Sequence, residues 1–208
     1  MRQTHPLTPS HKWKSDVDRS AHRDACQSKN IGVCVKGKGV GLLIMKKTIV
    51  VYGSSTGTCE GIANEIASKL GTEAISVSDL TADVVAENEN LILGTSTWGA
   101  GEVQDDWYDG IKVLKGADLS AKTVALFGCG DSSSYSDTFC GGMAEIYNAA
   151  KAAGANIVGA VDASEYTFDD SEAVIDGKFV GLALDNDNED DKTAGRIDAW
   201  IAAITPAL

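Results

Sequence analysis

The chain has 208 residues, 43% of them hydrophobic, which is enough for the core of one ordinary domain and leaves room for a further segment. No apolar run approaches the roughly 18–20 residues of a membrane span, so no membrane association is expected. The formal net charge of −12 at pH 7 argues against nucleic-acid binding, because neutralising phosphates requires Lys and Arg.

Residues 1–44 differ in composition from the rest of the chain. They contain 8 Lys and Arg residues and 3 Asp residues, which gives a net charge of +5. Residues 45–208 therefore have a net charge of −17. Because they are polar and lack periodicity, we predict a basic, disordered N-terminal extension followed by one domain over 45–208. A targeting arm is an alternative, and so is a true start at Met45. A zinc site is poorly supported, because its candidate ligands are irregularly spaced: His22, Cys26 and Cys34.

Short, continuous apolar runs recur after Met45. Such runs are typical of strands buried on both faces of a parallel sheet. They are KTIVVYG (47–53), AISV (74–77), NLILGTS (90–96), TVALFGCG (123–130) and NIVGAV (156–161).

Apolar residues at helical spacing lie between and after these runs. The stripes are Ile62, Ile66 and Leu70; Trp107, Ile111 and Leu114; Met143, Ile146, Tyr147 and Ala150; and Ile197, Ile201 and Ile204. Alternation of strands and helices predicts a doubly wound α/β fold with helices on both faces of the sheet.

A segment of about 25 residues separates the last apolar run from the final helix, which is too long for a bare connection. Asp176-Gly177 lies between apolar residues and predicts a hairpin, so we expect a small β insertion at the edge of the sheet. The following DNDNEDD (185–191) resembles a calcium loop. However, Asp190 stands where that loop needs Gly, so we expect a loop and the acidic first turn of the final helix.

GSSTG (53–57) fits two different sites. It matches the G-x-S-x-G elbow of a serine hydrolase, but no histidine follows position 22, so a triad in the order Ser, acid, His is excluded. It also fits a loop that binds a phosphate at the start of a helix, with the hydroxyls of Ser54, Ser55, Thr56 and Thr58. An ordinary Ser/Thr turn that caps the helix remains the alternative. The segment lacks the Lys of a nucleotide-hydrolysing P-loop and the G-x-G-x-x-G fingerprint of dinucleotide sites.

Two further loops follow neighbouring predicted strands, TSTWGAGEVQDDW (95–107) and GCGDSSSYSDTFCGG (128–142). Each is rich in glycine and polar residues and carries an aromatic side chain among small residues, Trp98 and Tyr135. Ligands of open α/β sheets bind at the carboxyl ends of the strands, where these loops converge. Two aromatic rings beside a phosphate loop predict a flat heterocycle with one phosphate, and FMN fits.

The three loops resemble those of the flavodoxins. GSSTGTCEGIA (53–63) is similar to the FMN-phosphate loop of that family, and the 95–102 and 128–142 segments are similar to its two isoalloxazine loops. KFVGLALD (178–185) resembles part of the insertion of long-chain flavodoxins. The resemblance implies a five-stranded parallel sheet of order 2-1-3-4-5 and a low-potential one-electron carrier that cycles FMN between quinone, semiquinone and hydroquinone.

The resemblance also implies the residues that bind FMN. Trp98 and Tyr135 would stack on the two ring faces, Gly130 and Asp131 would contact the pyrimidine edge, and the Gly99 carbonyl would accept a hydrogen bond from reduced N5 after a peptide flip. The full set is Ser54, Ser55, Thr56, Gly57, Thr58, Cys59, Thr95, Ser96, Thr97, Trp98, Gly99, Cys129, Gly130, Asp131, Tyr135, Asp137, Phe139 and Cys140.

Cys59 departs from the family pattern, which usually has Thr at this position. A thiol is a weak donor, so a phosphate hydrogen bond would be lost, and we expect an inert, packed thiol. Carboxylates near the ring are expected to lower its potential, since one at about 8 Å costs an anion roughly 0.5 kcal/mol in water, or about 20 mV. The candidates are Glu102, Asp105, Asp106, Asp131 and Asp137.

The sequence therefore predicts a monomeric electron-transfer protein rather than an enzyme, with no metal site. The five cysteines, without a C-x-x-C pair, indicate a reducing, cytoplasmic compartment. The resemblance implies redox partners with basic faces, such as a ferredoxin/flavodoxin–NADP reductase or a 2-oxoacid oxidoreductase. An FMN-dependent NAD(P)H:quinone reductase remains an alternative, whereas a phosphorelay receiver would need a carboxylate that VVYGSS (50–55) lacks.

Overall fold

A computed structural model describes residues 46–208. The predicted N-terminal extension, and the candidate zinc ligands within it, lie outside the described residues. In the described part, no helix is long and apolar enough to cross a membrane.

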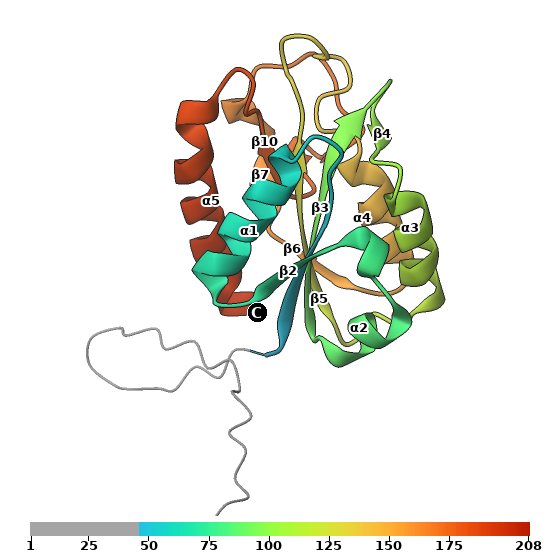
Figure 1. Cartoon of the computed structure of the whole chain (residues 1–208). Helices are drawn as coiled ribbons and strands as arrows, with labels where there is room; N and C mark the ends of the chain where they lie inside the picture. Colours follow the sequence, from blue (N-terminus) through green and yellow to red (C-terminus); the bar gives the residue numbers. More distant parts are fainter. Residues whose placement is uncertain (1–45) are drawn as a thin grey trace, which may run out of the picture.

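A parallel β-sheet forms the centre of the domain (Figure 1). Its main strands are β1 (Thr48–Gly53), β2 (Glu73–Ser76), β3 (Asn90–Trp98), β5 (Thr123–Cys129) and β6 (Asn156–Val158). β1 pairs with β2 and β3, and β5 pairs with β3 and β6, all in parallel. The order of the main strands in the sheet is therefore β2-β1-β3-β5-β6. Because β4 is a short strand that pairs only with β3, this is the predicted order 2-1-3-4-5 of the five main strands, which is confirmed. The apolar runs are buried because helices cover both faces of the sheet.

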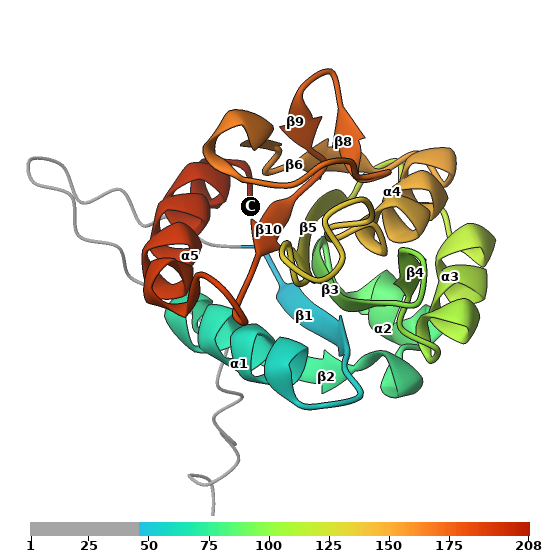
Figure 2. The same ribbon diagram turned by 90° about the horizontal axis from the view of Figure 1, so that it is seen from above.

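The helices form a layer on each side of the sheet, as Figure 2 shows from above. α1 (Thr58–Leu70) and α5 (Asp190–Ile204) pack on one face, and α3 (Trp107–Gly116) and α4 (Met143–Ala152) on the other. The four predicted apolar stripes lie on these helices, and most of their residues are buried. Short helical elements missing from the sequence prediction are α2 (Ala82–Glu87) and the 3₁₀ turns Val77–Asp79, Ala163–Glu165 and Thr205–Ala207.

The edge strand beside β5 consists of two segments. β6 pairs with the first half of β5, Thr123–Ala125, and β10 (Leu182–Leu184) pairs with the second half, Phe127–Cys129. The predicted strand over 156–161 is thus too long, because the chain leaves the sheet at Gly159, whose φ is 84°. The return of the chain to the sheet in β10 was not predicted.

The predicted insertion lies between β6 and β10 and is a small antiparallel sheet. Its strands are β7 (Val161–Asp162), β8 (Val174–Ile175) and β9 (Lys178–Phe179), in the order β7-β9-β8. Asp176 and Gly177 connect β8 to β9 with φ of 51° and 75°. Positive φ at both central residues is typical of a type I′ hairpin turn, so the predicted hairpin is confirmed.

An aromatic cluster packs the insertion against the main domain. Phe179 of β9 meets Phe139 edge-on, with ring centroids 5.8 Å apart, and lies 5.1 Å from the ring of Tyr166. The guanidinium of Arg196 on α5 lies over the Tyr166 ring at 4.2 Å. Burial raises the pKa of Tyr166 to about 12, so its hydroxyl stays protonated and donates to the Ala183 carbonyl.

The acidic segment after β10 forms a loop and then begins α5 at Asp190, with Asp191 also in its first turn. Acidic side chains at a helix N-terminus interact favourably with its dipole. Within residues 46–208, no group of His, Cys, Asp or Glu side chains is arranged to hold a metal ion. The segment is therefore the predicted loop and helix start.

Candidate functional site

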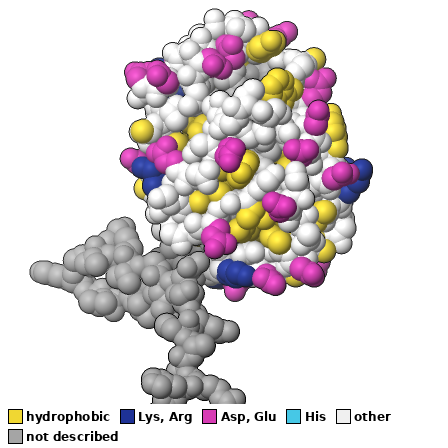
Figure 3. Space-filling view, viewed as in Figure 1, with side chains coloured by type: hydrophobic (Ala, Val, Ile, Leu, Met, Phe, Trp, Pro, Cys, Tyr) yellow, Lys and Arg dark blue, Asp and Glu magenta, His cyan; other side chains and the backbone are white. Residues whose placement is uncertain are grey.

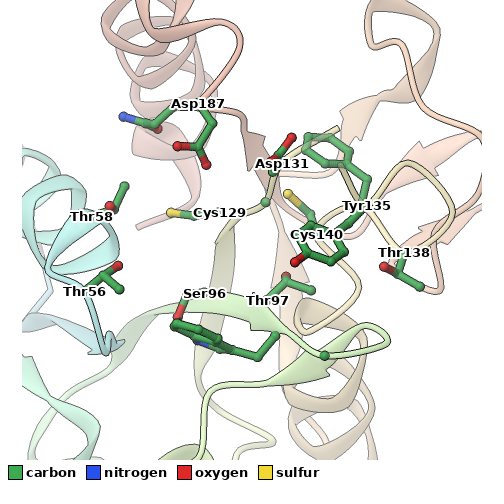
Figure 4. A pocket seen from close by; sticks show the side chains of 15 residues that line it. Thr56, Thr58, Ser96, Thr97, Cys129, Asp131, Tyr135, Thr138, Cys140 and Asp187 are labelled. Atoms are coloured by element: carbon green, nitrogen blue, oxygen red, sulfur yellow. The ribbon is translucent and has the colours of Figure 1, made fainter. Parts of the chain in front are cut away.

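A pocket with a volume of about 340 Å³ lies at the carboxyl ends of β1, β3, β5 and β10 (Figure 4). Four loops form it, which we call the first loop (54–58), the second loop (98–101), the third loop (130–138) and the fourth loop (185–189). They lie at one edge because the parallel strands all end there. The predicted convergence of the first three loops is confirmed.

The first loop presents hydroxyls and helix amides to the pocket. Thr56 and Thr58 line it, and α1 begins at Thr58 without a side-chain cap. The N–H groups of the first turn therefore have neither an intrahelical partner nor a capping side chain. The alternative of a Ser/Thr turn that caps the helix holds only in part: the Ser54 hydroxyl accepts a hydrogen bond from the N–H of Gly57, at 3.1 Å, which closes a turn, but no side chain caps α1. Gly57 has a φ of 93°, a conformation that favours glycine.

Cys59 faces the core and not the pocket. Its side chain is fully buried beside Ile62 and Cys129 in the cluster under α1. A hydrogen bond with Cys129, together with burial, raises the pKa of the Cys59 thiol well above its ordinary value. The expected inert, packed thiol is confirmed, and the Cys59 side chain does not belong with the residues that line the pocket.

Other predicted residues also lie outside the pocket lining. Ser55 is exposed and accepts a hydrogen bond from Gln104, and Thr95 is buried, donating to the Ser96 carbonyl at 2.8 Å. Asp137 is exposed to solvent. Ser54 and Gly57 shape the first loop and do not line the pocket themselves. Side-chain contacts with a ligand in the pocket are therefore not supported for these residues.

The second loop carries an exposed aromatic side chain into the wall of the pocket. Trp98 is 42% exposed and donates from Nε1 to the Ser96 hydroxyl at 2.9 Å. Gly99 has a φ of 52°, and the Ala100 N–H donates to the Glu102 carboxylate at 2.5 Å. The loop turns there and returns as β4 (Glu102–Val103), antiparallel to β3. Ser96, Thr97, Trp98 and Gly99 all line the pocket, as predicted.

The third loop carries the other exposed aromatic side chain. Tyr135 is 56% exposed, and Figure 4 shows it beside Asp131 at the pocket wall. Asp131 accepts hydrogen bonds from the N–H groups of Ser133 and Ser134, at 3.0 and 2.9 Å. A hydrogen bond from the Ser134 side chain, together with these two backbone bonds and one from Asn188, lowers the pKa of Asp131 to about 2. The loop therefore has a fixed negative charge at neutral pH.

Residues at the end of β5 and after the third loop, most of them buried, close the pocket. The predicted residues Cys129, Gly130, Phe139 and Cys140 line it there. Cys140 is fully buried and donates from its thiol to the Gly128 carbonyl at 3.5 Å. Burial raises the pKa of the Cys140 thiol well above its ordinary value, so it stays protonated.

Three residues that line the pocket were missed: Thr138, Asn186 and Asp187. Asn186 and Asp187 belong to the fourth loop, which follows β10. The sequence signal for them was the short apolar run Leu182–Leu184, which brings the next residues to the same sheet edge.

Only some of the carboxylates that were predicted to lie near the ring line the pocket. Among the carboxylates expected near the ring, Asp131 lines the pocket, and Glu102 lies next to Gly99. Asp105 and Asp106 are exposed residues before α3 and do not line it, and neither does Asp137. The missed Asp187 does. Of the described residues that line the pocket, none is Lys, Arg or His.

The doubly wound sheet, the uncapped helix start and the two exposed aromatic side chains define the flavodoxin-like class of α/β protein. The family model for flavodoxin matches residues 50–200. The chain belongs to the flavodoxin family.

Curated relatives and solved structures agree with this assignment. Flavodoxin 1 of Azotobacter vinelandii is 41% identical over 167 residues, covering 77% of this chain and 96% of the relative, and flavodoxin 1 of Escherichia coli K12 is 38% identical over 168 residues, covering 79% and 96%. The crystal structure of Fusobacterium nucleatum flavodoxin bound to flavin mononucleotide is similar with a TM-score of 0.74 and 32% identity, covering 79% of this chain and 99% of that one.

Proposed function

We propose that the chain binds FMN non-covalently in this pocket and carries electrons one at a time between oxidoreductases. The observation that carries the proposal is the pocket itself, in which an uncapped helix N-terminus and two exposed aromatic side chains lie at one sheet edge. Its volume of about 340 Å³ is within the usual range for small-molecule sites. The FMN-bound flavodoxin of Fusobacterium nucleatum supports the same ligand.

The first loop suits the phosphate of FMN. Amide N–H groups at a helix start and the hydroxyls of Thr56 and Thr58 are neutral donors, and the helix dipole favours an anion there. Cys59 contributes its backbone N–H but no side-chain donor, since its thiol is packed in the core. Neutral donors would thus hold the phosphate, since none of the described residues that line the pocket has a basic side chain.

The second and third loops suit the ring of FMN. Trp98 and Tyr135 remain 42% and 56% exposed, although aromatic side chains of this size usually gain from burial. A flat ring that packs against them would exclude water from both. The polar backbone around Gly130 and Asp131 would then lie at the ring edge.

When bound, FMN supplies a ring that takes up and releases electrons singly. Asp131 and Asp187 place negative charge in the pocket, and no Lys or Arg is among the described residues that line it. These carboxylates therefore disfavour an additional negative charge on the bound ring, which lowers the reduction potential of FMN. We propose that the Gly99 carbonyl accepts a hydrogen bond from the ring when the ring gains a proton. This requires a rotation of the peptide at Gly99, which costs little free energy because glycine tolerates positive φ.

We further propose that the partners are oxidoreductases with basic faces, of the ferredoxin/flavodoxin–NADP reductase or 2-oxoacid oxidoreductase type. The support is the net charge of −17 over residues 45–208 and the Asp and Glu side chains spread over the face in Figure 3. Such association should weaken as salt is added, because exposed charges are screened within about 10 Å at 0.1 M ionic strength. Electron transfer that is insensitive to salt would count against these partners.

The test is an anaerobic reductive titration of the purified full-length chain, loaded with FMN, followed by absorbance and electrode potential. Two separated one-electron steps, and no oxidation of NAD(P)H by the protein alone, are expected for a carrier. A single two-electron step with steady NAD(P)H oxidation would instead identify a quinone reductase. Failure of the apoprotein to bind FMN would overturn the proposal at its first step.

A further inference from the structure

Asp185 is a buried carboxylate next to the pocket, but it does not line the pocket. It directly follows β10 and is 1% exposed. Among the described residues, no Lys or Arg forms an ion pair with it, and the residues that line the pocket do not include it. A buried carboxylate is costly unless hydrogen bonds satisfy its oxygens. Its partners therefore show what it stabilises.

The partners of Asp185 belong to two different loops. From the third loop, Ser132 donates to Oδ2 through its backbone N–H at 3.1 Å and through its hydroxyl at 2.5 Å. From the fourth loop, Asn188 donates to Oδ1 through its backbone N–H at 3.1 Å and through Nδ2 at 3.0 Å. One buried carboxylate thus joins segments 53 positions apart in the sequence.

Further bonds extend the connection to the pocket wall. Asn188 Nδ2 also donates to Asp131 Oδ1 at 2.9 Å, and the N–H of Gly130 donates to the Leu184 carbonyl at 3.0 Å. Asp131 in turn fixes the turn that leads to Tyr135, whose N–H donates to the Asp131 carbonyl at 3.0 Å. Residues 130–132 of the third loop are therefore bonded to β10 and the fourth loop.

Both loops present residues to the pocket. Tyr135 and Asp131 line it from the third loop, and Asn186 and Asp187 line it from the fourth, as Figure 4 shows for Asp131, Tyr135 and Asp187. The distance between these walls depends on the bonds behind them. If the third loop moves away, the carboxylate of Asp185 loses both of its hydrogen bonds from Ser132 while it remains buried, which is unfavourable.

We propose that Asp185 is a positioning residue that locks the third and fourth loops together and so determines how tightly the pocket holds the ring of FMN. The inference rests on the proposed function, because it assumes that the ring lies between these loops. It assigns no contact with FMN to Asp185. The first loop, which holds the phosphate, makes none of these bonds.

The test compares ring binding with phosphate binding in the apoprotein. In Asp185→Ala, the affinities for FMN and for riboflavin, which has no phosphate, should both fall by about tenfold or more, since a lost set of buried hydrogen bonds is involved. The weak binding of inorganic phosphate should stay unchanged. Amide hydrogen exchange should become faster at residues 130–136 and 185–189 and remain unchanged at 54–62.

Two further variants make the result specific. Ser132→Ala removes one donor and leaves Asn188 in place, so it should show the same pattern at smaller amplitude. Asp118→Ala is a control for the removal of a carboxylate elsewhere, because Asp118 also accepts from a backbone N–H, that of Ser120 at 3.0 Å, but is exposed and lies outside the pocket lining. It should leave riboflavin and FMN affinity unchanged.

The outcomes separate this inference from the proposed function. If the wild-type chain does not bind FMN, the proposed function fails. If it binds FMN and Asp185→Ala binds riboflavin equally well, with unchanged exchange at 130–136, the positioning role is wrong. Should Asp185→Ala not fold, Ser132→Ala decides by the same criteria: loss of riboflavin affinity with intact phosphate binding supports the role, and equal loss of both refutes it.

Discussion

Gln104 donates a hydrogen bond from Nε2 to the hydroxyl of Ser55 at 3.3 Å, and so joins the segment after β4 to the first loop. Gln104 is 4% exposed and is held at both ends, since its N–H donates to the Thr95 hydroxyl and its Oε1 accepts from the Asp106 N–H. The first loop is otherwise exposed around Ser55. Gln104 therefore supports the loop that we assign to the phosphate.

We expect Gln104→Ala and Ser55→Ala to weaken FMN binding by loosening the first loop. The two changes should not be additive, and the coupling energy in a double-mutant cycle should be about 0.5–1.5 kcal/mol, the worth of one hydrogen bond. Fluorescence titration of the apoproteins with FMN measures all four affinities. Strict additivity would show that the bond does not contribute to binding.

Tyr135→Ala should weaken FMN binding by about twofold to tenfold, because a stacked aromatic pair contributes about 0.5–1.5 kcal/mol beyond buried area. Tyr108→Ala provides a matched control, since Tyr108 is similarly exposed, at 46% against 56%, but does not line the pocket. The dissociation constant for FMN is the measurement. An equal effect of the two substitutions would place Tyr135 outside the site.

Gly94→Ala should destabilise the fold, whereas Gly195→Ala should stabilise it. A Cβ at position 94 would lie 2.0 Å from Cζ of the buried Phe127, and overpacking of this kind costs about 1–3 kcal/mol or more. A Cβ at position 195 in α5 meets nothing within 4 Å, and Ala is favoured over Gly in a helix by about 1 kcal/mol. Urea unfolding of the two variants measures both free energies. Equal midpoints would contradict the packing described for β3 and β5.

The pKa of Asp131, lowered from 3.8 to about 2, predicts a loss of stability in acid. A carboxyl whose pKa is lower in the folded state contributes stability that is complete above the unfolded value and is lost as pH falls through the folded value. The free energy of unfolding should therefore decrease between about pH 4 and pH 2. Asp131→Asn keeps an oxygen acceptor but cannot ionise, so its stability should decrease less over this range. Urea titrations at several pH values measure the difference, and parallel curves would refute the assignment.

Cys59 and Cys140 should resist alkylation in the folded protein. Both are fully buried, and the pKa of each thiol is raised well above its ordinary value, so little thiolate forms at pH 8. Iodoacetamide treatment followed by peptide mapping should show modification of these two residues in urea but not in buffer. Rapid labelling of Cys59 in buffer would mean that its thiol reaches the pocket.

The sequence allowed the main strands and the helices to be predicted, because continuous apolar runs and helical stripes depend mainly on local pattern. The sheet order, in contrast, came from the resemblance of the three loops to those of the flavodoxins. Trp98 and Tyr135 could also be assigned to the surface at the sheet edge, since each stands among small and polar residues. Thr56 and Thr58 followed from the hydroxyl-rich loop before a helix.

The parts that could not be predicted depend on contacts between distant segments. β10 has only Leu182–Leu184 and becomes a strand by pairing with β5, so its pattern alone does not distinguish it from a loop. Asn186 and Asp187 were missed for the same reason.

The division of the edge strand into β6 and β10 affects how copies of the molecule meet. A long, flat edge strand offers unpaired N–H and C=O groups on which another chain can add a strand, and short edge strands reduce this risk. Here the edge beside β5 offers only the three-residue segments Asn156–Val158 and Leu182–Leu184, and the chain leaves the sheet between them to form the insertion. At this edge, the insertion thus limits the length of strand that is open to edge-to-edge pairing with another chain.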